Sequence, residues 1–299
     1  MAPFFSKDYE MKIIQITDIH LTTEGKSILG RDPNLNFQNV LNHINENQYD
    51  AEVIIITGDL SDWGETSDYL RLKNIIEKNK IPIHLCIGNH DDRANFLSVF
   101  PTLSDKNGFI QNVVKLSKGS AILLDTWGPE THAGHFCMKR KDWLRETLNT
   151  VDEDVFLFLH HNIVDTKIKP VDQIKLLDTS LLREVCNEFK DKIRFIFHGH
   201  CHLILNGSFS GIPFYSPRGT NHAAWPAFQE KKFLSSADLA ETYSVIMVED
   251  EDIMVHTIEF NYRGEIKNEG LPDYNTWDKN CLLYTSPSPR DRQKCRMPS

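Results

Sequence analysis

The sequence predicts an α/β protein in which two β-sheets pack together as a sandwich flanked by helices. Short apolar runs of strand type alternate with amphipathic helical segments as far as residue 197, and from residue 203 on the pattern is all-β. The early strands are continuously apolar, which is typical of a sheet covered on both faces. We expect the later hairpins to form a second sheet packed against the first. Hydrophobic residues make up 40% and charged residues 25%, the proportions of a globular domain.

The strand predictions rest on apolar, β-branched runs such as VIIIT at residues 53–57. The predicted strands before the all-β region lie at residues 12–17, 53–57, 82–87, 120–125, 155–159 and 193–197. Those of the all-β region lie at residues 203–209, 212–215, 243–248 and 253–260.

The helix predictions rest on capping residues and on helical spacing of apolar residues. Asp32 is an N-cap and Pro33 a first-turn residue for the helix at 33–48. Tyr69, Leu72 and Ile75 share one face of the next helix. The predicted helices lie at residues 33–48, 65–79, 139–148 and 180–189.

The expected organisation is one domain between two short end segments. Residues 1–10 are an N-terminal extension, and residues 11–280 form the domain, with a flap or cap insert at about 163–178. Residues 281–299 begin CLLYTSPSPRD, which resembles a translated transposon-type sequencing adapter, so we expect this tail to be non-native and the true C-terminus to be lost behind it. Without the tail's four basic residues and one acidic residue, the net charge falls from −9 to −12.

Charge and hydropathy exclude several classes of protein. No stretch reaches the roughly 20 apolar residues of a transmembrane segment, and the N-terminus lacks the apolar core of a signal peptide. A cytoplasmic location is therefore expected, and the unpaired spacing of the cysteines indicates reduced thiols. An acidic chain is a poor match for a nucleic-acid groove. Assembly into a homo-oligomer is left open.

Polar side chains follow five of the predicted strands. Because open α/β sheets place their sites at the carboxyl ends of strands, we expect these side chains to meet. Their oxygen and nitrogen donors suit Mn, Fe, Co or Zn, and they outnumber what one ion needs, which indicates two divalent ions sharing a carboxylate. The side chains are Asp18, His20, Asp59, Asn89, His90, His160, His161, His200 and His202.

The order D-x-H, GD, GNH, HH and GHxH across residues 11–260 resembles the calcineurin-like binuclear metallophosphoesterases. The GNHDD run, the glycines at 25 and 30, and LLD at 176–178 resemble the branch of glycerophosphodiesterases and class III cyclic-nucleotide phosphodiesterases. The resemblance implies the four-layer metallophosphoesterase fold. It also implies hydrolysis of a small phosphodiester, a cyclic nucleotide or a glycerophosphodiester, by a hydroxide that bridges the two metals.

The same resemblance implies a role for each motif residue. One metal is held by Asp18, His20, Asp59 and His202, and the other by Asp59, Asn89, His160 and His200, with Asp59 bridging. His90 is the catalytic histidine, and both Asn89 and His90 also contact substrate. Asn162 stands where the family has the proline of HHP, a departure in the loop that carries His160.

Four further side chains have weaker assignments. Asp62 either orients His90 as part of the catalytic machinery or caps the helix that follows. His161, Arg218 and His222 are candidate substrate-binding residues, the last two in a loop that could equally be a structured turn. His132 is expected to be an ordinary surface or half-buried residue.

Other functions are consistent with the same motifs. The apolar insert at 163–178 would suit a phospholipase C-like hydrolase of phospholipid headgroups. A non-catalytic scaffold is only a minor alternative, because such relatives have lost metal ligands and every expected ligand is present here. Nuclease and protein phosphatase activities are less favoured because no basic groove is evident.

Overall fold

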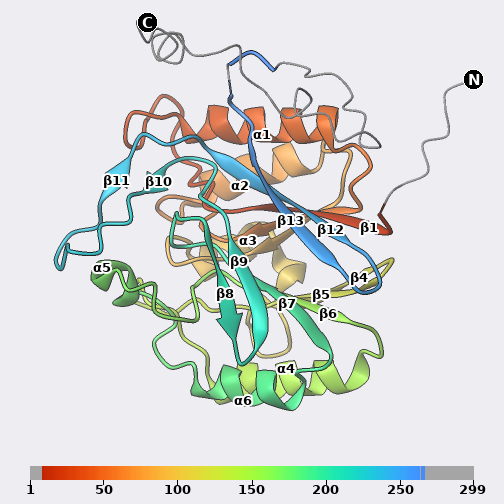
Figure 1. Cartoon of the computed structure of the whole chain (residues 1–299). Helices are drawn as coiled ribbons and strands as arrows, with labels where there is room; N and C mark the ends of the chain where they lie inside the picture. The colour runs from red at the N-terminus through yellow and green to blue at the C-terminus, as the bar shows by residue number, and fades with distance from the viewer. Residues whose placement is uncertain (1–8, 263, 267–299) are drawn as a thin grey trace, which may run out of the picture. The chain divides into compact units, whose positions relative to one another are not determined.

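The computed structural model describes residues 9–262 and 264–266 (Figure 1). The predicted tail at 281–299 and all but the last two residues of the predicted N-terminal extension lie outside this range. Met1–Asn261 and Tyr262–Ser299 are separate units, and the fold below belongs to the first. The described helices include none long and apolar enough to cross a membrane.

The first sheet has the order β13-β12-β1-β2-β3. Three parallel strands, β1, β2 and β3, form one side, and β12 pairs antiparallel with β1. Its strands are β1 (Met11–Ile16), β2 (Val53–Thr57), β3 (Ile83–Cys86), β12 (Thr242–Val248) and β13 (Ile253–Glu259).

The second sheet has the order β4-β5-β6-β7-β9-β8, with β5, β6, β7 and β9 parallel. Its strands are β4 (Asn112–Leu116), β5 (Gly119–Leu123), β6 (Val155–Phe158), β7 (Ile193–Phe197), β8 (Leu205–Phe209) and β9 (Ile212–Ser216). A short ribbon of β10 (Ala223–Ala224) and β11 (Ser236–Ala237) stands apart from both sheets (Figure 1).

Helices cover the outer face of each sheet (Figure 1). One apolar core joins the first sheet to the helices of the chain's first third, and another joins the second sheet to α4 and α6. The helices are α1 (Pro33–Asn47), α2 (Thr66–Ile76), α3 (Arg93–Val99), α4 (Met138–Thr150), α5 (Lys169–Asp172) and α6 (Ser180–Glu188), with a 3-10 turn at Pro101–Leu103.

A third core lies between the sheets. Ile13 and Ile55 of the first sheet pack there with Phe156, Phe158 and Phe197 of the second. Because successive strand residues point to opposite faces, Ile14 and Ile54 point outward into the core shared with the helices. The predicted α/β sandwich flanked by helices is therefore confirmed.

The predicted division of strands between the sheets was wrong. The hairpin of β12 and β13 joins the first sheet beside β1, and the second sheet already begins at β4. A buried strand in either sheet is apolar on both faces, so composition does not record which sheet it enters. Strand β4, helices α3 and α5, and the β10–β11 ribbon were not predicted.

Candidate metal centre and active site

The strand ends carry an unusual backbone conformation. Nine non-glycine residues in the described part of the chain have positive φ, and five of them are predicted metal ligands. The left-handed conformation costs an L-residue roughly 1–2 kcal/mol, and strain of this kind clusters at functional sites. The five are Asp18, His20, Asp59, His200 and His202, with φ between 46° and 68°.

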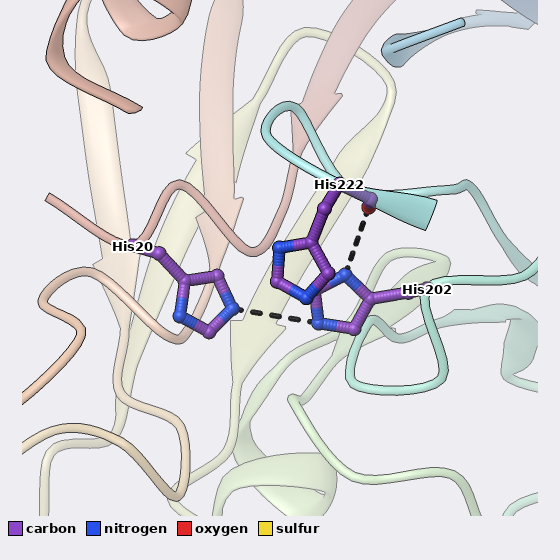
Figure 2. A group of neighbouring side chains, drawn as sticks. All are labelled: His20, His202 and His222. Carbon is purple, nitrogen blue, oxygen red and sulfur yellow. Dashed lines mark hydrogen bonds between the residues drawn. The ribbon is translucent and has the colours of Figure 1, made fainter. Parts of the chain in front are cut away.

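One group of side chains lies at the end of β1. The Nδ1 of His202 donates to the carbonyl of His222 at 3.0 Å, so its Nε2 carries a lone pair when the ring is neutral. The Nδ1 of His20 donates to Asp62 Oδ1 at 3.2 Å, so the Nε2 of His20 also carries a lone pair when the ring is neutral. The two Nε2 atoms face each other at 3.4 Å (Figure 2). Asp18 Oδ1 lies 3.5 Å from the Nε2 of His202.

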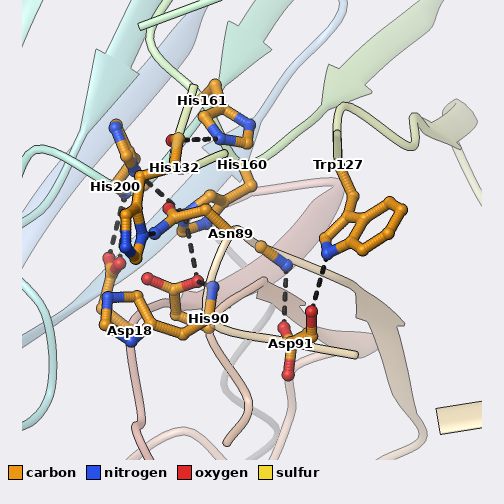
Figure 3. A network of polar contacts seen from close by, with 12 residues as sticks. Asp18, Asn89, His90, Asp91, Trp127, His132, His160, His161 and His200 are labelled. Carbon is orange, nitrogen blue, oxygen red and sulfur yellow. Dashed lines mark hydrogen bonds and ion pairs between the residues drawn. The ribbon is translucent and has the colours of Figure 1, made fainter. Parts of the chain in front are cut away.

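A second group lies at the ends of β3, β6 and β7. The Nδ1 of His160 donates to the carbonyl of Thr57 at 2.8 Å, so its Nε2 also carries a lone pair in the neutral ring. That Nε2 lies 3.1 Å from Asn89 Oδ1 and 3.2 Å from His200 Nδ1 (Figure 3). It also lies 3.3 Å from Asp59 Oδ1.

Asp59 faces both groups. Its Oδ1 is the oxygen near His160, and its Oδ2 lies 3.7 Å from His20 Nε2. Burial alone would raise the pKa of this carboxyl, but the imidazoles of His160, His90 and His20 outweigh it and hold the pKa well below its usual range. An ionised carboxylate between the two groups can serve both.

The donor set fits two divalent cations. In each group, lone pairs of imidazole nitrogen and carboxylate or amide oxygen converge, which is unfavourable unless a proton or cation lies among them. Burial alone would lower the pKa of His160, but the negative charge of Asp59 outweighs burial and raises this pKa to about 9. Burial lowers the pKa of His200 well below its usual value. In the first group, donor atoms of Asp18, His20, Asp59 and His202 all lie within 4.8 Å of one another.

His90 lies at the rim of these groups. Its backbone N–H donates to Asp59 Oδ1 at 2.9 Å, and its ring Nδ1 donates to the backbone carbonyl of Asp62 at 2.9 Å. The Asp62 carboxylate is 3.8 Å from the His90 ring and nearer to His20. Asp62 therefore contacts His90 chiefly through its main chain, and its side chain orients His20.

Two predicted substrate-binding residues lie away from the open site. Arg218 forms an ion pair with Glu259 at 2.8 Å and does not line the pocket. His161 is buried, and its Nδ1 contacts Thr126 Oγ1 at 2.8 Å while its Nε2 donates to the carbonyl of His132 at 3.2 Å. Both ring nitrogens of His161 thus hold the loop that carries His132.

His132 is exposed, as expected from sequence, but it also lies in the site, which was not expected. The amide nitrogen of Asn89 donates to His132 Nδ1 at 2.9 Å, which turns the amide oxygen toward His160 (Figure 3). The rings of His132 and His90 are 5.3 Å apart. No motif marks this histidine, because it follows β5 by a loop of irregular sequence.

Asp91 was also not singled out from the sequence. Its buried carboxylate accepts backbone N–H bonds from Gly88, Leu60 and Ser61 at 2.7–3.2 Å. Burial, together with the nearby charge of Asp59, raises the pKa of Asp91 to about 6. Asp91 fastens the turn after β3 to the turn after β2, and so places Asn89 beside Asp59.

A pocket of about 540 Å³ opens above the two groups. Its floor contains most of the predicted ligands together with His90, His132 and His222. Among the described residues that line it there is no lysine or arginine. Its remaining wall is largely apolar and comes from separate segments of the chain, with Ile28, Leu29, Val171, Ile174, Ala223, Ala224 and Leu234.

The two groups of side chains at the strand ends share the carboxylate of Asp59 and lie below an open pocket on a two-sheet sandwich. This arrangement is that of a binuclear metal-dependent hydrolase. The family model described as calcineurin-like phosphoesterase matches residues 11–203. The chain belongs to the calcineurin-like phosphoesterase family.

Individual relatives extend the match beyond the family model. A probable cyclic nucleotide phosphodiesterase of Rhodopseudomonas palustris is 31% identical, over 86% of this chain and 95% of that protein. A probable glycerophosphodiester phosphodiesterase of Arcobacter nitrofigilis is 24% identical, over 89% and 97%. A dimetal phosphatase from Danio rerio has the same fold, with a TM-score of 0.63 at 12% identity over 85% of this chain and 97% of that one.

Proposed function

We propose that this protein is a metal-dependent phosphodiesterase that hydrolyses a small phosphodiester. The observation that carries the proposal is the convergence of two groups of lone-pair donors on the shared carboxylate of Asp59. The names of the relatives from R. palustris and A. nitrofigilis support a diester as the substrate. The full set of ligands, all in place, gives no support to a non-catalytic scaffold.

Two bound divalent ions, which we propose to be Mn, Fe, Co or Zn, would supply positive charge for the phosphoryl oxygens and acidify a coordinated water. Asp18, His20, Asp59 and His202 would hold one ion, and Asp59, Asn89, His160 and His200 the other. Because Asn89 is neutral, it adds an oxygen ligand without cancelling charge that an anionic substrate needs.

The chain's own side chains would orient the substrate and assist the leaving group. His90 lines the pocket, and the Asp62 carbonyl holds its Nδ1–H, so that a doubly protonated ring would donate its Nε2–H to the leaving oxygen and become neutral. His132 keeps the Asn89 amide turned toward the second position. Asp62 holds the His20 ring in the tautomer that leaves Nε2 unprotonated.

The pocket wall favours a cyclic nucleotide over a glycerophosphodiester. A largely apolar wall suits the flat face of a base, whereas an ethanolamine or glycerol headgroup needs more polar partners. The second candidate is a phospholipid, because Leu29 and Leu234 are 62% and 60% exposed at this wall and could contact acyl chains. A cytoplasmic location and homo-oligomer formation remain predictions.

A substrate panel with Mn²⁺-loaded protein tests the proposal. We expect cyclic AMP and bis-nitrophenyl phosphate to be hydrolysed faster than nitrophenyl phosphate, because a monoester presents no second substituent to the apolar wall. Faster turnover of the monoester would contradict a diesterase. Faster turnover of glycerophosphoethanolamine or phosphatidylglycerol than of cyclic AMP would overturn the choice of a cyclic nucleotide as substrate. The protein would still be a phosphodiesterase.

A further inference from the structure

Leu29 forms the tip of a tight turn at the wall of the pocket. The backbones of Ile28 and Arg31 exchange two N–H to C=O hydrogen bonds, at 2.9 Å and 3.0 Å, so Leu29 and Gly30 are the two central residues of the turn. Their φ angles are 50° and 79°. Two successive positive φ angles are those of a type I′ turn. Leu29 therefore holds a left-handed conformation that asparagine or aspartate adopts more easily than leucine.

Packing within the chain offsets little of the cost of this conformation. The Leu29 side chain is 62% exposed, although leucine is among the residues most often buried in proteins. An exposed apolar side chain on an unfavourable backbone does not stabilise the free protein. Local costs of this kind concentrate at functional sites, which points to a ligand as the partner of the Leu29 side chain.

The hairpin of β8 and β9 offers a comparison within the same chain. Its turn has Ser210 and Gly211 between the paired residues Phe209 and Ile212, and their φ angles of 56° and 82° make it a type I′ turn as well. Ser210 has a short polar side chain and does not line the pocket. The same turn position thus carries leucine at the pocket wall and serine away from it.

Arg31 fixes the Leu29 turn in place. Its guanidinium donates to the carbonyls of Asn221 and Leu239 at 3.2 Å and 2.7 Å and forms an ion pair with Glu241 at 2.8 Å. These contacts join the turn to the segments that follow β9 and β11. The tip of the turn consequently has a defined place at the pocket.

The pocket has room for more than the phosphoryl group of a substrate. Its volume is about 540 Å³, so a diester whose phosphate lies on the floor near His90 extends to the wall that contains Leu29. We propose that Leu29 is a specificity-determining residue, whose side chain contacts the flat apolar group, such as a base, that the diester carries beyond its phosphate. The inference rests on the proposed function, since it concerns the substrate of the same site.

Two diesters with the same leaving group test the proposal. Bis-nitrophenyl phosphate retains an aromatic substituent when nitrophenolate leaves, whereas methyl nitrophenyl phosphate retains only a methyl group. With Mn²⁺-loaded protein, Leu29→Asn should reduce kcat/KM for the bis-ester by about 5- to 30-fold, chiefly through KM, because an apolar contact with the substrate is lost. The methyl ester should change by less than about 2-fold, because its substituent buries little apolar surface.

Stability and two further variants complete the test. Leu29→Asn should raise the melting temperature by roughly 2–4 °C, since asparagine suits the turn. Ser210→Asn is the matched control, because it changes the same turn position away from the pocket, and it should leave kcat/KM for both diesters unchanged. Leu29→Met keeps an apolar side chain and should retain most of the preference for the bis-ester.

Three results would overturn the proposal while leaving the diesterase activity in place. They are equal losses on the two diesters in Leu29→Asn, no loss on either, or a lower melting temperature, which would show that Leu29 is needed for packing. If Leu29→Asn does not fold, Leu29→Ala removes the same apolar contact, and the same selective loss is expected. Wild-type protein that hydrolyses neither diester would contradict the proposed function itself.

Discussion

Asp59 and its neighbours show how single residues set the chemistry of the site. The carboxylate accepts the backbone N–H of His90 at 2.9 Å and faces one ligand group through each oxygen. One residue thus positions the turn that carries Asn89 and His90 and also faces both groups of proposed metal ligands. Each of these contacts depends on the left-handed backbone at Asp59, which directs its side chain into the site.

His90→Ala should reduce activity in a way that depends on the leaving group. An alkoxide leaves poorly without protonation, and general acid assistance is typically worth about 100- to 10,000-fold, whereas nitrophenolate needs little help. We expect a far larger loss on cyclic AMP than on bis-nitrophenyl phosphate, measured as kcat/KM with metal content determined in parallel.

Two results would contradict this role. Equal losses on both substrates, with both metals retained, would assign His90 to binding of phosphoryl oxygens. Loss of a metal would make His90 a ligand and remove Asn89 from that role.

At the scale of elements, glycines at the strand ends let the turns approach one another closely. A Cβ on Gly58 would lie 2.6 Å from His160 Nδ1 and 2.8 Å from the backbone nitrogen of Gly88. Gly58 also has φ of +94°, which a side chain disfavours. The end of β2 can therefore pack against the ligands of β3 and β6 only with glycine at this position.

Gly58→Ala should lower the metal content as well as the stability, because the added methyl group displaces His160. Gly108→Ala is the matched control, since Gly108 has φ of +81° and a methyl group added there would meet nothing within 4 Å. The left-handed backbone costs both variants roughly 1–2 kcal/mol, but only Gly58→Ala should lose metal by elemental analysis. Equal metal content in the two folded variants would refute the steric argument.

The elements that sequence predicted best are those with a strong local signal. The strands at Val53–Thr57 and Ile193–Phe197 match residue for residue, and Asp32 caps α1 by accepting from the N–H groups of Asn34 and Leu35. Sheet membership was not predictable, since β12 pairs with β1 across more than 200 residues of chain and only tertiary contacts decide it.

The same contrast between local and distant signals holds in the site. The motif residues that end strands do meet, because parallel strands bring their carboxyl ends to one edge. The place of His132 in the site depends on a loop, and the ion pair of Arg218 with Glu259 depends on an element distant in the sequence. Neither contact leaves a periodic signal in the sequence, so neither could be predicted from it.

At the scale of the whole molecule, the proposed metal ligands come from both sheets. Asp18, His20, Asp59 and Asn89 follow strands of the first sheet, while the other proposed ligands, His160, His200 and His202, follow strands of the second. Ions bound there would link the two halves of the sandwich, and binding to the folded state alone stabilises it.

Chelation should therefore lower the melting temperature, and adding Mn²⁺ should restore it. A ligand present at 100 times its dissociation constant adds about 2.7 kcal/mol to the free energy of unfolding. Differential scanning calorimetry with and without chelator measures the effect. A melting temperature that does not respond to metal would show that the ions do not join the sheets.

The most direct test of the central claim is the metal stoichiometry of diester hydrolysis. Metal-free protein is titrated with Mn²⁺ while the hydrolysis of bis-nitrophenyl phosphate is followed. Two groups of ligands around Asp59 predict no activity without metal and a maximum at two ions per chain. Activity in the fully chelated protein, or a maximum at one ion per chain, would contradict a binuclear phosphodiesterase.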